Sequence, residues 1–121
     1  MRMRSCLVIA AGLALAACAT ESPYSAIQQA ELSMKRANEA QANRYAPAEL
    51  AQAQEKLGRA KVAAEDDDRW QEARRLAVQA DADADLAAER AHTARTQSML
   101  DEARAGMEAL ESETQRPIQR P

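Results

Sequence analysis

Residues 70–94 read WQEARRLAVQADADADLAAERAHTA, and this stretch decides the fold. Apolar side chains, nearly all of them alanine, return along it at alternating steps of three and four residues: Trp70, Ala73, Ala77, Ala80, Ala84, Ala87, Ala91 and Ala94. Such spacing places every member on one face of an α-helix and is typical of coiled-coil-like packing. It predicts a helix from about residue 69 to residue 112 whose first half packs closely against neighbouring helices.

Two shorter helices are predicted before it, over residues 24–43 and 47–64. Their apolar residues also recur in threes and fours: Ile27, Ala30, Met34 and Ala37 in the first, and Leu50, Ala53, Leu57, Ala60 and Ala64 in the second. Pro23 and Pro47 stand at the expected first turns, where the missing N–H of proline removes no helical hydrogen bond.

Short connections make consecutive helices antiparallel neighbours. We therefore expect an all-α fold over residues 23–113, an antiparallel three-helix bundle or helical hairpin with an overlong C-terminal helix. Strong helix formers dominate the composition, and β-branched residues are scarce. Residues 114–121, with two prolines, are expected to form a disordered tail.

The apolar series of the long helix changes direction after Ala94. Its continuation meets Ser98 and Asp101, and a new apolar set follows at Leu100, Ala103, Met107 and Leu110. The six residues from Ala94 to Leu100 correspond to a rotation of about 240° around the helix axis. Because the shorter helices run out near Ala91, the new set is expected to lack a partner within the chain. These four residues are the candidate partner-binding surface.

The N-terminal segment has the pattern of a bacterial lipoprotein signal. Residues 1–5 are positively charged through Arg2 and Arg4, a short apolar run follows, and Leu15, Ala16 and Ala17 precede Cys18. The apolar run has 14 residues, whereas a membrane-spanning helix needs about 20. We predict cleavage after residue 17 and lipid on Cys18, with residues 18–22 as a short tether. The alternative is an ordinary secretory signal in which the cysteine is coincidental.

Composition restricts the functional classes further. Loss of Arg2 and Arg4 with the signal leaves 14 basic and 19 acidic side chains, a net charge of −5, which argues against nucleic-acid binding. Cys6 would leave with the signal and Cys18 would be acylated, so no disulfide is expected. No combination of nucleophile, histidine and acid supports catalysis, and we expect neither enzymatic activity nor a cofactor.

The turn before the long helix contains three aspartates in a row, residues 66–68, which raises the question of calcium binding. We favour a capping role, with Asp68 as the N-cap residue and Gln71 three positions later.

The DADAD run at 81–85 resembles the first half of a calcium loop, but Leu86 stands where the loop needs glycine and His92 where it needs glutamate. On a helix, Asp81 and Asp83 point about 200° apart. No metal site is therefore expected. Asp83 either faces solvent or sets the register against a basic residue of a shorter helix.

Several segments resemble one family: YAPAEL at 45–50, LGRA at 57–60 and WQEARRLA at 70–77, with Gln79-Ala80 and Asp83-Ala84 after them. Over residues 20–105 the chain is similar to domain of unknown function 4398, a family of Gram-negative envelope lipoproteins. The resemblance implies no catalytic residues. Some relatives continue into a peptidoglycan-binding domain, which is not carried over to this chain. By the same kind of resemblance, Ala19 after the cysteine implies sorting to the outer membrane with the chain facing the periplasm.

These observations favour a non-catalytic helical interaction or scaffold module, anchored to the outer membrane through lipid on Cys18. The expected partner of Leu100, Ala103, Met107 and Leu110 is a helix of another envelope protein or a second copy of the chain. The alternative is a structural spacer, in which Arg116 and Arg120 contact the anionic cell wall. The residues Gln119-Arg120-Pro121 stand where a well-known coiled-coil lipoprotein has the lysine that links it to the wall, which disfavours covalent linkage. Non-covalent peptidoglycan contact stays open.

Overall fold

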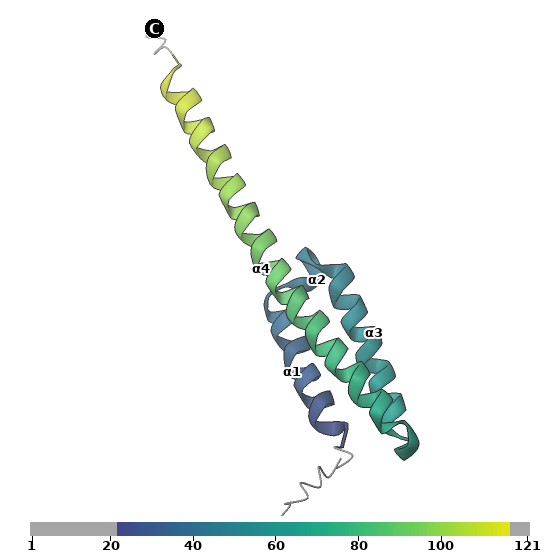
Figure 1. Ribbon diagram of the computed structural model, residues 1–121. Helices are drawn as coiled ribbons and strands as arrows, with labels where there is room; N and C mark the ends of the chain where they lie inside the picture. The colour runs from purple at the N-terminus through teal and green to yellow at the C-terminus, as the bar shows by residue number, and fades with distance from the viewer. Residues whose placement is uncertain (1–21, 117–121) are drawn as a thin grey trace, which may run out of the picture.

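The computed structural model describes residues 22–116 and shows three helices side by side, one of which continues far beyond the others (Figure 1). The elements in chain order are α1 (Tyr24–Glu39), α2 (Ala42–Tyr45), α3 (Pro47–Ala64), the 3-10 turn η1 (Asp67–Arg69) and α4 (Trp70–Thr114). No strand occurs among these described residues. The predicted all-α fold with an overlong final helix is confirmed, and α3 has the predicted bounds.

The first helix is shorter than predicted. Helix α1 ends at Glu39, and the one-turn helix α2 begins only at Ala42. Between them Gln41 adopts a left-handed conformation, with φ of 61°, which redirects the chain. After the redirection Ala42 and Ala46 are buried in the core, as is Ala40 just before it. Gln41 is neither glycine nor asparagine, so the sequence carried no usual signal for this break.

The capping residue of the turn between α3 and α4 lies two residues earlier in the sequence than predicted. Asp66, and not Asp68, supplies the capping carboxylate: its Oδ1 accepts a hydrogen bond from the backbone N–H of Asp68 at 3.1 Å. The three residues after Asp66 form η1, and α4 begins at Trp70 without a side-chain cap. Helix α4 extends to Thr114, two residues further than predicted. Expectations for residues 1–21 and 117–121 lie outside the described residues.

The core is built mainly from alanine. Six of the eight predicted members of the α4 series are buried: Ala73, Ala77, Ala80, Ala84, Ala87 and Ala91. The two end members, Trp70 and Ala94, are only partly buried. The stripes of α1 and α3 face α4 as predicted, except that Met34 is partly buried. Because alanine keeps backbones close together, the fold relies on close helix contact more than on large side chains.

Ion pairs between helices fix the register of this uniform core. The aspartates of the DADAD run diverge, as predicted. The Asp83 carboxylate meets Lys56 of α3 at 2.5 Å, whereas Asp85 meets Arg36 of α1 at 3.0 Å. Asp81 accepts a hydrogen bond from the fully buried hydroxyl of Ser33 on α1. Of the two alternatives for Asp83, the structure therefore shows the register-setting one.

Helix α4 leaves the bundle near Ala91, its last fully buried residue. From residue 99 to residue 116 every side chain is exposed. Figure 1 shows this part of α4 running on alone beyond the level of α2. The residues from 92 to 114 span about 35 Å at 1.5 Å per residue. Among the described helices, none is both long and apolar enough to cross a membrane.

Candidate interaction surface

The distal half of α4 presents the predicted apolar set to solvent. We call Leu100, Ala103, Met107 and Leu110 the distal face. Their spacing of three, four and three residues places them on one side of the helix. The exposed fractions are 48% for Leu100, 63% for Met107 and 69% for Leu110, and no described residue covers them. Soluble helices normally bury such a stripe, so this surface is a candidate for contact with another molecule.

Two further residues extend the distal face. Met99 is 60% exposed and lies beside Leu100 and Ala103 on the helix surface. Gly106 lies between Ala103 and Leu110, and a Cβ atom built on it would meet nothing within 4 Å. Met99 was not predicted to belong to this surface, because it does not fit the three-four series.

Charged residues flank the distal face and pair mostly along the helix itself. Arg104 lies 3.5 Å from Asp101, and Arg116 lies 3.1 Å from Glu113. Pairs three residues apart support an exposed helix by a few tenths of a kcal/mol each. These contacts help α4 to stay helical where no other helix packs against it.

The opposite end of the bundle carries an aromatic pair. The rings of Tyr24 and Trp70 are 6.5 Å apart between centroids and meet edge to face at 73°. The Tyr24 hydroxyl donates a hydrogen bond of 3.4 Å to the carbonyl oxygen of Ala64. The Trp70 Nε1–H is shielded from solvent and finds no acceptor within residues 22–116. This pair ties the start of α1 to the turn between α3 and α4.

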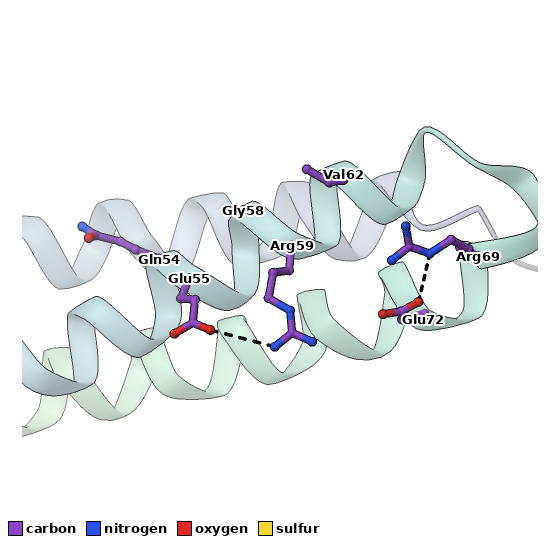
Figure 2. Close-up of a pocket in the computed structure, with 7 residues that line it drawn as sticks. All are labelled: Gln54, Glu55, Gly58, Arg59, Val62, Arg69 and Glu72. Atoms are coloured by element: carbon purple, nitrogen blue, oxygen red, sulfur yellow. Dashed lines mark hydrogen bonds and ion pairs between the residues drawn. The ribbon is translucent and has the colours of Figure 1, made fainter.

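A shallow groove lies between α3 and the start of α4, and Figure 2 shows its charged lining. Two ion pairs lie along it, Glu55 with Arg59 at 3.9 Å and Glu72 with Arg69 at 3.1 Å. The hydrogen bond from Arg69, together with its charge, holds the pKa of the Glu72 carboxyl below its ordinary value. The groove is thus lined by one ion pair on α3 and one at the start of α4.

Other sequence-predicted sites have the following positions. Cys18 and the residues before it, Leu15, Ala16 and Ala17, lie outside the described residues. Within residues 22–116 no group of three potential metal-ligating side chains comes together. Helix geometry separates the aspartates of the DADAD run, and Asp66 of the turn is occupied with backbone capping.

Comparison with known proteins gives one result. The family model described as Domain of unknown function (DUF4398) matches residues 25–103. The chain belongs to this family. The matched segment of this DUF4398 protein includes the bundle from Ser25 onward together with Leu100 and Ala103, and it stops before Met107 and Leu110. No curated protein and no solved structure matches the chain.

Proposed function

We propose that this DUF4398 protein is a lipoprotein of the outer membrane, facing the periplasm, that acts as a non-catalytic helical interaction module. The observation that carries the proposal is the course of α4. Its first half completes the bundle, and its second half displays the distal face with no described residue against it. Large exposed apolar side chains at helical spacing are a usual way for one helix to bind another.

The sequence before the bundle supports the membrane anchor. Leu15, Ala16 and Ala17 followed by Cys18 match the lipoprotein-processing pattern, and several acyl chains give stable anchoring. Residues 18–22 can span only about 17 Å when fully extended. The anchor would therefore keep the aromatic end of the bundle near the bilayer and leave the distal face free.

The anchor is tested by metabolic labelling with an alkyne fatty acid, followed by fractionation of the envelope. The wild-type chain should carry label and sediment with outer membranes. Cys18→Ser should lose the label and accumulate with its signal still attached, because processing requires the lipid. An unlabelled wild-type chain that fractionates with the soluble proteins would contradict the anchor.

The interaction surface is tested by a photoreactive amino acid at position 107 in living cells. We expect light-dependent adducts of defined mass from position 107. The matched control is position 86, since Leu86 is also an exposed leucine of α4 but lies beside the bundle, where it is 43% exposed. Leu110→Asp should suppress the adducts at 107. Equal yields from positions 107 and 86, or none from either, would contradict the proposal.

A structural spacer is the second candidate, and the length of α4 favours it. Its 45 residues correspond to a rod of about 68 Å. In this case Arg116 and Arg120 would contact the anionic wall polymer. Binding to purified wall sacculi that is abolished by Arg116→Ala with Arg120→Ala would favour the spacer, and no binding would exclude it.

A further inference from the structure

Two of the three methionines within residues 22–116 lie on the distal face or beside it. Met99 is 60% exposed and Met107 is 63% exposed. Ala103 stands four residues after the first and four before the second, so the two thioethers flank this small residue along the helix surface. The third methionine, Met34 of α1, is partly buried and packs against both core clusters. Within the described part of the chain, exposed thioethers are therefore concentrated at the apolar surface of α4.

We propose that Met99 and Met107 are oxidation sites, and that their oxidation releases whatever partner covers the distal face. The inference rests on the proposed function, because it assigns a means of control to the same surface. The oxidant is hydrogen peroxide. The sulfur lone pair attacks one peroxide oxygen, an S–O bond forms and the O–O bond breaks. The sulfur loses two electrons to the peroxide, and the departing hydroxide takes the proton of the transferred hydroxyl and leaves as water.

The structure leaves both methionines open to a small oxidant in the free chain. From residue 99 to residue 116 every side chain is exposed, and Figure 1 shows no other helix beside this part of α4. An oxygen atom added to Met99 or Met107 meets solvent, so the bundle is not disturbed. At Met34 the same oxygen would enter a packed contact between helices. Because methionine oxidation follows exposure, the two methionines of α4 should react before Met34.

Oxidation changes what the distal face can bind. A thioether is apolar and adapts its shape to a neighbour, whereas a sulfoxide is polar and accepts hydrogen bonds. Against an apolar partner surface, the sulfoxide oxygen either loses its water without compensation or holds water in the contact, and both weaken binding. Met107 lies between Ala103 and Leu110, so a sulfoxide there interrupts the apolar series of the distal face.

Partner binding should in turn protect the same methionines. A partner that covers the distal face removes Met107 from solvent, and a small oxidant then reaches its sulfur more slowly. Oxidation rates in native membranes, compared with those of the purified chain, therefore report on occupancy of the surface. A merely structural role for Met107 would give the same rate in both samples, since no described residue covers it.

The first test measures which methionines react. A soluble form that begins at Ala19 keeps every residue of the packed core and lacks both natural cysteines. After treatment with hydrogen peroxide, mass spectrometry of its peptides should show Met99 and Met107 oxidised at least about fivefold faster than Met34. The melting temperature should change by less than about 2 °C while only these two are oxidised. Equal rates at all three positions, or early loss of the fold, would overturn the inference.

The second test measures the partner contact in isolated envelopes. A photoreactive amino acid at position 103 leaves both methionines in place. Brief peroxide treatment before illumination should lower the yield of adducts at least about tenfold, because an uncompensated polar oxygen now faces the partner. Reductases that act on the two sulfoxide epimers should restore the yield. An unchanged yield from envelopes in which Met99 and Met107 are fully oxidised would overturn the inference.

The matched control replaces both thioethers with a side chain that peroxide cannot oxidise. Met99→Leu with Met107→Leu keeps the helix propensity and the apolar character of the surface. Its adducts from position 103 should form as in the otherwise unchanged chain and should survive peroxide. If this variant loses its adducts to peroxide as well, oxidation acts elsewhere and the assignment to Met99 and Met107 is wrong.

The outcomes separate the inference from the proposed function. If position 103 gives adducts that peroxide does not change, the oxidation sites have no control over binding, and the proposed function stands. If positions 103 and 107 both give no adduct in untreated envelopes, the proposed function fails and the inference fails with it.

Discussion

The same substitution at two alanines of α4 distinguishes its packed half from its free half. Ala80 is fully buried and belongs to the cluster that includes Ile27, Leu57 and Ala77. Ala103 is exposed on the distal face. Leucine and alanine are both strong helix formers. Ala80→Leu and Ala103→Leu therefore differ mainly in what the added side chain meets.

The magnitude follows from the burial of each site. Leucine adds three carbon atoms to a position where Ala80 has no exposed surface. Forcing extra carbons into a close-packed core costs typically 1–3 kcal/mol, and three of them at a helix interface should cost about 3 kcal/mol. For a domain of this size, such a loss lowers the melting temperature by about 15 °C. Ala103→Leu should change the free energy of unfolding by less than about 0.5 kcal/mol.

The assay is thermal unfolding followed by circular dichroism, on the soluble form that begins at Ala19. The protein is kept at about 5 µM, so that weak self-association does not contribute. Wild type and Ala103→Leu should melt together, and Ala80→Leu should melt far below both. Melting temperatures for the two variants within about 2 °C of each other would refute the division of α4 into a packed and a free half.

Three further predictions concern the helix contacts and the groove. Lys56→Met removes the partner of the half-buried Asp83 carboxylate and should destabilise the fold by about 1–2 kcal/mol, measured by urea unfolding; no loss would mean that the pair does not fix the register. Gly58→Ala should stabilise α3 by about 0.5–1 kcal/mol in the same assay, because the added Cβ meets nothing within 4 Å, and destabilisation would show a hidden contact. Arg69→Ala should return the pKa of Glu72 toward its ordinary value in an NMR titration. Since that pKa is lowered in the folded state, the stabilisation is present above the ordinary pKa and is lost as pH falls through the lowered one; an unmoved Glu72 would contradict the assignment of the shift to Arg69.

The fold could be predicted largely because its core has a simple period. Alanine every three or four residues along α4 marks one buried face, and every member of this series from Ala73 to Ala91 is buried in the structure. Pro47 marked the start of α3 at the correct residue. The break at Gln41 could not be predicted, because its left-handed backbone occurs at a residue that is neither glycine nor asparagine, the usual signals for such a break.

The candidate surface was predictable in part for the same reason. The distal face follows a regular series of apolar residues: Leu100, Ala103, Met107 and Leu110. Its residues are exposed because α1 and α3 do not reach beyond the level of Ala91 in the bundle. Met99 falls outside that series, so only the exposed helix in the structure adds it to the surface. Trp70 was expected to be a full member of the α4 series, but its place at the first turn of α4 leaves it partly exposed against Tyr24.

The contacts that fix the register could not be predicted from the sequence, because they join residues of different helices. Asp83 and Lys56 are far apart in sequence, so the spacing alone left both a basic residue and solvent open as neighbours of Asp83. The shift of the cap from Asp68 to Asp66 is a similar case. Three adjacent aspartates can all cap a helix, and the choice depends on the 3-10 turn that precedes α4.

Amide hydrogen exchange of α4 tests the central claim most directly, when the acylated protein in native membranes is compared with the soluble monomer. In the monomer, the amides from residue 95 to residue 114 should exchange orders of magnitude faster than those from residue 73 to residue 91, since only the latter are packed. In native membranes the distal amides should gain protection, because the distal face is then covered. Distal amides that are protected in the monomer, or that stay fast in both samples, would contradict the account.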